Sequence, residues 1–218
     1  MFILTPDESD MQLSPHSFSP VAAPKSKEIL HAVRGAFVDK GFDGASMQDL
    51  ARAAGMSVGN FYRYFSSKDA IIAQMIALDM AEIEAVFAQV ITSPQPMDSL
   101  RLVIAQRIAQ YKSDKSGQLW AEIAAAAQRK PDIAANTCQM EVAIAGYLTQ
   151  VFAAETGLSL QEAQARFAAE ASFVILLVRS AAMLTPSVPS AQISDPTPLI
   201  LRTINHVLDA ISGAGSKG

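Results

Sequence analysis

The chain has 218 residues, half of them apolar, and its 17 basic and 21 acidic side chains give a formal net charge of −4. With 37 alanines against 11 glycines and 11 prolines, helix-favouring residues dominate, which predicts a mostly helical globule. The single Cys138 excludes an intramolecular disulfide, and His16, His31 and His206 are not spaced as zinc ligands. We therefore expect neither a metal nor a cofactor.

The most apolar run, Phe173 to Val178, has six residues, far fewer than the ~20 that a bilayer span requires. Near the start of the chain, acidic residues follow Met1 to Leu4 where a signal peptide would stay hydrophobic. Both features predict a cytoplasmic protein. The net acidic charge would by itself argue against nucleic acid as a partner, provided that the charge is spread evenly.

In chain order, residues 1–24 are rich in proline and serine and have no periodicity, which predicts a disordered tail. Apolar periodicity then predicts a helix over about 25–40, ended by Gly41. Next, Ser46 and Asp49 form an S-x-x-D pair, which is typical of a capped helix start.

Gly55 ends that second helix after about two turns, and a third is expected over about 57–64. A long fourth helix, capped by Ser66 or Ser67, ends at Thr92. Five further helices are predicted between proline and glycine breaks, over about 97–112, 117–129, 132–156, 160–184 and 197–212. The expected fold is all-α, with about nine helices.

The segment from Asp49 to Phe65 has the mechanics of a helix-turn-helix. Ala51 is small where two helices cross, Gly55 permits the left-handed turn, and Phe61 packs back from the second helix. The spacing of these three residues alone is a weak signal, because many unrelated helix pairs match it.

A longer stretch, from Lys25 to Leu78, resembles the DNA-binding domain of the TetR family of transcriptional regulators. The matching residues include Gly41-Phe42, Leu50-Ala51, Ala54-Gly55, Phe61-Tyr62-Arg63-Tyr64-Phe65 and Ser67-Lys68-Asp69. Two positions depart from the family pattern. Ser66 stands where a proline is common, and Val58 stands where a basic or hydroxylated residue is frequent.

The charge is not spread evenly along the chain. Residues 21–70 hold seven basic and five acidic side chains, a net of +2, whereas residues 1–20 and 71–218 each carry −3. The basic end therefore coincides with the motif. Because +2 is modest, geometry must supply most of the DNA binding.

The resemblance implies that the third helix is a recognition helix that enters the major groove. Asn60 and Arg63 have the chemistry to read adenine and guanine edges, and Val58 to contact a thymine methyl. The remaining predicted DNA-contact residues match the motif or suit phosphates: Lys25, Lys27, Ser46, Ser57, Gly59, Tyr62, Tyr64 and Lys68. Arg63 and Lys68 could instead be solvated charges, while Phe61 and Phe65 are expected in the core.

The resemblance also implies an effector pocket in the C-terminal bundle. The predicted pocket residues are the larger side chains on those helices: Phe87, Tyr111, Trp120, Glu122, Met140, Tyr147 and Phe152. For each residue separately, ordinary bundle core is the alternative. Cys138 is expected to be a buried small residue.

The last two predicted helices are apolar on several sides, which predicts self-association. The predicted dimer-interface residues are Phe167, Ala171, Val174, Val178, Ile200, Ile204, Val207, Leu208 and Ile211. The chain thus divides into a tail (1–24), a DNA-binding domain (25–70) and a ligand-binding and dimerisation domain (71–218).

Together, these features predict a homodimeric regulator, most often a repressor in this family, that reads a palindromic operator and responds to an unknown small molecule. One alternative is a helical small-molecule-binding or scaffold protein without specific DNA binding. An all-helical enzyme is the other, but no nucleophile with a base, paired carboxylates or metal cluster supports it, so no catalytic residue is assigned.

Overall fold

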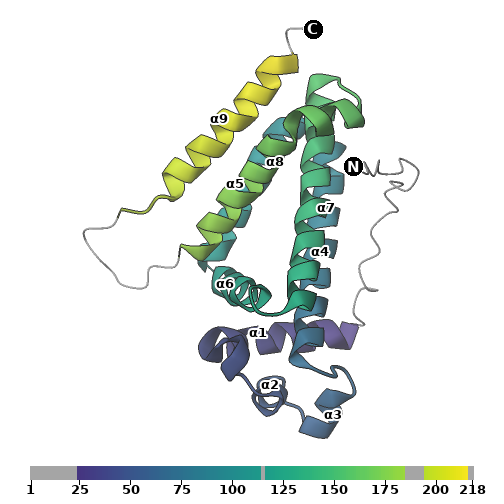
Figure 1. Cartoon of the computed structure of the whole chain (residues 1–218), viewed down its shortest axis with the longest axis vertical. Helices are drawn as coiled ribbons and strands as arrows, with labels where there is room; N and C mark the ends of the chain where they lie inside the picture. Colours follow the sequence, from purple (N-terminus) through teal and green to yellow (C-terminus); the bar gives the residue numbers. More distant parts are fainter. Residues whose placement is uncertain (1–23, 114–115, 185–193, 216–218) are drawn as a thin grey trace, which may run out of the picture.

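The computed structural model describes residues 24–113, 116–184 and 194–215, and within these ranges all regular structure is helical (Figure 1). The predicted tail lies almost wholly outside these residues. The helices are α1 (Pro24–Gly44), α2 (Met47–Ala53), α3 (Val58–Tyr62), α4 (Lys68–Ile91), α5 (Pro96–Ser113), α6 (Ser116–Ala127), α7 (Pro131–Thr156), α8 (Leu160–Met183) and α9 (Thr197–Gly215). The prediction of an all-α fold is confirmed.

Local sequence signals set the ends of the early helices. The Ser46 hydroxyl accepts from the Asp49 amide at 3.1 Å, and the Asp49 carboxylate accepts from the Ser46 amide at 3.0 Å, so the predicted capping pair is present. Of the two serines considered for α4, Ser67 is the cap. As predicted, Gly41 interrupts the first helix, because its φ of +71° is non-helical; one further short turn, which was not predicted, follows to Gly44.

The small helices α2 and α3 lie at one end of the molecule, below α1 (Figure 1). Their core is aromatic: Phe37 stacks on Phe42 with ring centroids 5.9 Å apart, and Phe61 lies 5.5 Å from Phe65. All four rings are at most 2% exposed. The expectation that Phe61 and Phe65 belong to the core is therefore confirmed.

Helix α4 crosses the predicted domain boundary at residue 70. Its first turns bury Ile71, Ile72 and Met75 in the same core as α1 and α3, and that core continues into Leu119 and Ile123 of α6. The N-terminal helices and the bundle thus share α4 and one continuous apolar core.

The upper bundle packs around α7, which contacts α4 and α8 along its length (Figure 1). Phe152 of α7 meets Phe167 of α8 edge to face, with centroids 6.1 Å apart. In the described parts of the chain, no helix is long and apolar enough to span a membrane.

Most of the predicted dimer-interface residues face the interior of this single chain, which corrects the prediction for them. Phe167, Ala171, Val174, Ile204, Leu208 and Ile211 are buried, and Val178, Ile200 and Val207 are partly buried against the same core. The wide apolar stripes of α8 and α9 are needed to pack these two helices on α5 and α7.

Candidate functional site

The first site is the surface formed by α3 and the residues that follow it. Ser57 caps α3 by accepting from the Asn60 amide at 3.3 Å, and the buried Phe61 and Phe65 anchor the segment to the core. The remaining side chains of this segment face solvent: Ser57, Val58, Asn60, Tyr62, Arg63 and Tyr64. Gly59 lies on the same surface, with no atom within 4 Å of where a Cβ would stand.

The turn between α2 and α3 holds this surface in place. Gly55 has φ +65°, a left-handed conformation that side chains disfavour, and the Met56 amide closes the turn on the Ala51 carbonyl at 2.9 Å. The cap of α2 adds a charged contact, because Lys40 of α1 lies 2.5 Å from the Asp49 carboxylate. Hydrogen bonds from Lys40 and Ser46 hold the pKa of Asp49 well below its ordinary value.

The residues predicted to contact phosphate have different surroundings. Ser46 and Lys25 are exposed, although Lys25 also pairs with Glu28 at 2.7 Å, and Lys27 is partly buried. Lys68 is engaged within the chain: its ammonium donates to the carbonyls of Phe42 at 2.7 Å and Asp43 at 3.1 Å.

Lys68 also lies 4.9 Å from the centre of the Phe42 ring. The structure therefore gives this lysine a role in joining α4 to the end of α1, and its contact with phosphate stays a prediction. Arg52 of α2, with 74% of its side chain exposed, is a basic group beside the motif that the sequence interpretation did not include.

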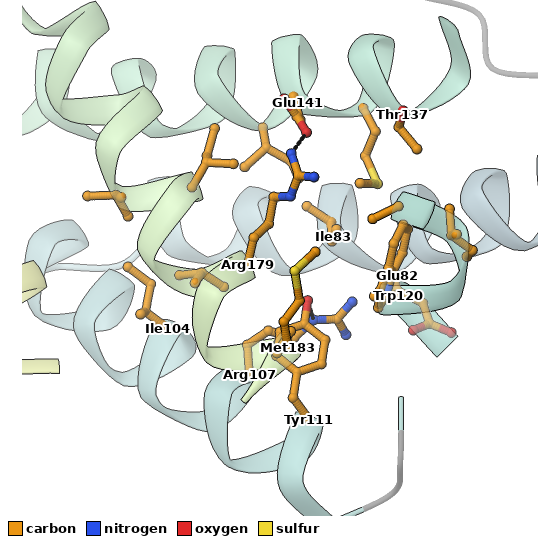
Figure 2. Close-up of a pocket in the computed structure, with 18 of the residues that line it drawn as sticks. Glu82, Ile83, Ile104, Arg107, Tyr111, Trp120, Thr137, Glu141, Arg179 and Met183 are labelled. Carbon is orange, nitrogen blue, oxygen red and sulfur yellow. Dashed lines mark hydrogen bonds and ion pairs between the residues drawn. The ribbon is translucent and has the colours of Figure 1, made fainter. Parts of the chain in front are cut away.

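The second site is a cavity of about 500 Å³ in the bundle, lined by side chains from α4 to α8 (Figure 2). Its walls are mainly aliphatic, with residues such as Ile83, Val103, Ile123, Ile144 and Val174. Such a cavity, apolar with a few polar groups, is typical of a small-molecule site.

Four of the predicted pocket residues line this cavity: Phe87, Tyr111, Trp120 and Met140. Tyr147 lies behind it, stacked on Phe87 with centroids 5.3 Å apart, and Phe152 is fully buried in the bundle core. The prediction for Glu122 is wrong, because its carboxylate points toward α1 and accepts from the Phe42 amide at 3.0 Å.

The polar residues of the cavity were missed by the sequence interpretation, except for Tyr111 and Trp120. They include Glu82 and Arg107 on one side, and Glu141 paired with Arg179 on the other (Figure 2). Cys138 is exposed and lines the same cavity, so the expectation that it is buried is wrong. A charged residue on an otherwise apolar helix face was the available signal for these groups.

The two sites are linked through Asp79 of α4, which is 4% exposed. Arg34 of α1 donates to its carboxylate at 2.7 Å, and Arg107 of α5 lies 3.8 Å from the other oxygen. Burial opposes the charge of Arg107, but Tyr111 and Asp79 raise the pKa of Arg107 above its ordinary value, so the guanidinium stays charged. One buried carboxylate thus joins α1 to the wall of the cavity.

The described residues contain no group of three or more His, Cys, Asp or Glu side chains that could hold a metal ion. Below α1, the structure presents a short exposed helix with polar and aromatic side chains. Above it lies a largely apolar cavity with an electrostatic connection to α1.

Comparisons with known proteins agree on the class of this chain. The family described as bacterial regulatory proteins, tetR family, matches residues 29–75. The transcriptional regulator UidR of Escherichia coli is 29% identical over 133 residues, which are 59% of this chain and 65% of UidR. The transcriptional repressor Rv1474c of Mycobacterium tuberculosis is 29% identical over 126 residues, covering 53% of this chain and 63% of that protein. The chain thus spans just under two thirds of the length of these relatives.

Solved structures share the fold. Salmonella enterica GusR superposes with a TM-score of 0.64 at 23% identity, covering 85% of this chain and 96% of GusR. A putative transcriptional regulator from Pseudomonas aeruginosa gives a TM-score of 0.63 at 19% identity, covering 88% and 92% of the two chains.

Proposed function

Because the chain belongs to the TetR family of bacterial regulatory proteins, we propose that it is a homodimeric transcriptional repressor released from DNA by a small molecule. In this account, residues up to the start of α4 bind DNA, and the bundle from α4 onward binds the effector and the second subunit. Such a regulator acts in the cytoplasm, where bacterial DNA lies.

The observation that carries the DNA-binding proposal is the two-sided character of α3. Its buried side is fixed by Phe61, which is 0% exposed, while Tyr62 on the other side is 51% exposed. Asn60 and Arg63 stand on this exposed side, where their amide and guanidinium groups are free to pair with base edges in a major groove. Ser57, Val58, Gly59 and Tyr64 complete the proposed contact surface.

Two such surfaces in a symmetric dimer would read a palindromic site, with half-sites about one DNA turn, ~34–36 Å, apart. Selection of bound duplexes from a random-sequence pool tests this directly. We expect an inverted repeat with that spacing. Recovery of no common sequence would reject the proposal in favour of a helical small-molecule-binding protein that does not recognise DNA sequence.

The dimer surface is proposed on the outer faces of α8 and α9. Along α8, Ala165, Ala169, Phe173 and Leu176 form an exposed, uncharged stripe at helical spacing, which Arg179 follows one turn later. Leu176 is 56% exposed and Leu199 of α9 is 58% exposed. Apolar residues that remain exposed after the chain has packed its own core are the natural contact for a second copy.

The cavity between α4 and α8 is proposed as the effector site. A ligand there can control DNA binding only if it favours one arrangement of the domains over the other. The shared core and the Asp79 contacts to both α1 and α5 provide a physical route for such a preference.

A further inference from the structure

One end of the cavity wall carries a buried hydrogen-bond donor without a partner and a guanidinium that donates to no carboxylate among the described residues. The indole Nε1 of Trp120 is buried and has no hydrogen-bond partner. A buried donor without an acceptor costs free energy, so such a group in a ligand cavity points to an acceptor on the ligand.

Arg107 lies at the same end, and its guanidinium points toward the part of the cavity where Trp120 and Glu82 lie (Figure 2). Its hydrogen bonds within the chain go to neutral partners, the Tyr111 hydroxyl at 3.1 Å and the Gln110 amide oxygen at 3.4 Å. The distance of 3.8 Å to Asp79 is too long for a hydrogen bond.

Asp79 does not neutralise Arg107 alone, because the same carboxylate is held at 2.7 Å by Arg34. Two guanidinium groups therefore share one buried carboxylate. The next carboxylate on the wall is Glu82, one turn along α4, which makes no hydrogen bond or ion pair in the described structure and acts on Arg107 only at a distance.

A second, more polar cavity adjoins this end and includes Glu82 and Gln110 in its own wall. It reaches α1 at Arg34, whose Nε is also buried without a partner. Two donors without acceptors thus lie along one path from the effector cavity to α1. The opposite end of the effector cavity needs no further charge, since Arg179 there pairs with Glu141.

On the basis of the proposed effector site, we infer that the ligand is an amphipathic carboxylic acid. Its carboxylate binds Arg107 and the Trp120 indole, and its apolar body lies among the aliphatic residues of the cavity. A carboxylate supplies both the hydrogen-bonded counter-ion that Arg107 lacks and the acceptor that Trp120 lacks. It would bind Arg107 next to the Asp79 contact that also holds α1.

The chain contains one tryptophan and one cysteine, and both line this cavity. Binding to the full chain can therefore be followed by Trp120 fluorescence and, independently, by protection of Cys138 from a maleimide. The probes are two matched pairs that differ in the head group: octanoate with octan-1-ol, and 4-phenylbutyrate with 4-phenylbutan-1-ol. No DNA is present in these measurements.

We expect each acid to bind at least about tenfold more tightly than its alcohol, as for a hydrogen bond to a charged group. Arg107→Gln removes this preference and leaves the affinity for the alcohols, Arg107→Lys retains part of it, and the exposed control Arg202→Gln keeps it. Trp120→Phe, followed by Cys138 protection, weakens the acids by about three- to tenfold. Glu82→Gln strengthens them by removing a like charge.

Thermal melting of each variant shows whether it is folded. If Arg107→Gln is not, Trp120→Phe and Arg107→Lys provide the test. Equal affinity for acid and alcohol, an acid preference that survives loss of Arg107, or no signal at about 1 mM of every probe would overturn the inference. Acid binding without sequence-selective DNA binding would instead contradict the proposed function and leave the ligand class standing.

Discussion

Arg34 of α1 donates a 2.7 Å hydrogen bond to Asp79 of α4, and this contact joins the N-terminal helices to the bundle above them. Only 5% of the Asp79 side chain is exposed, and it has a second guanidinium, that of Arg107, 3.8 Å away. A buried carboxylate keeps its negative charge in this position because both guanidinium groups offset the cost of removing it from water.

Replacing Asp79 with alanine should therefore destabilise the chain strongly. Two partly buried guanidinium groups would lose their shared partner, and the free energy of unfolding should fall by about 3 kcal/mol. Urea unfolding measures the change. The matched control is Asp209→Ala, which breaks the 2.6 Å ion pair between Arg101 and Asp209, whose side chain is 67% exposed. This substitution should lower the free energy of unfolding by at most about 1 kcal/mol. Equal losses for the two variants would contradict the account.

The close approach of α6 to α8 depends on Gly117. A Cβ at this position would lie 2.3 Å from the Ala182 carbonyl oxygen, which belongs to backbone and cannot turn away. Gly117→Ala should therefore lower the unfolding midpoint. Gly146→Ala, in the middle of α7 with nothing within 4 Å of the new methyl, should instead stabilise by up to about 1 kcal/mol. Thermal melts of the two variants should shift in opposite directions.

Acid should weaken the start of α2. Hydrogen bonds from Lys40 and Ser46 lower the pKa of Asp49 in the folded state, so its contribution is present above the ordinary aspartate pKa, near ~4, and is lost as the pH falls further. Asp49→Asn should be less stable than wild type at pH 7, with the difference shrinking toward pH 3. Ser46→Thr, which keeps a capping hydroxyl, should follow wild type. A difference that grows on acidification would contradict this assignment.

Charge on the outer face of α8 should separate the proposed dimer. Leu176→Lys introduces a charge into the stripe formed by Ala165, Ala169, Phe173 and Leu176, and light scattering coupled to size-exclusion chromatography should report the mass of a monomer. Leu102→Lys is the control, because Leu102 is 65% exposed but lies on α5. If Leu176→Lys remains dimeric while Leu102→Lys separates, the interface lies elsewhere.

Periodicity and capping residues predicted each of the nine helices in the described residues, because those signals are local. Ser46 with Asp49 and Gly55 behave as their residue types demand. The short turn after Gly41 was not predicted; there the Phe42 amide donates to Glu122, 80 positions away, in a segment that no local pattern connects to it.

The sites were predicted less evenly. The exposed residues of α3 follow from a compact motif, whereas Lys68 could not be recognised as a structural residue before the Phe42 and Asp43 carbonyls were placed beside it. For α8 and α9 the sequence shows that several sides are apolar, but not which side the chain covers itself. The sequence also does not show that Arg107 lies beside Asp79, because the two residues belong to different helices.

The central claim, sequence-specific DNA binding through α3, is tested most directly by fluorescence anisotropy of a labelled selected duplex against a scrambled one at physiological salt. We expect wild type to bind the selected duplex at least about a thousandfold more tightly. The Asn60→Ala and Arg63→Ala variants should each lose about 1–3 kcal/mol of that preference, while the control Arg202→Ala should lose none. Equal affinity of wild type for the two duplexes, or a preference unaffected by both α3 variants, would contradict the account.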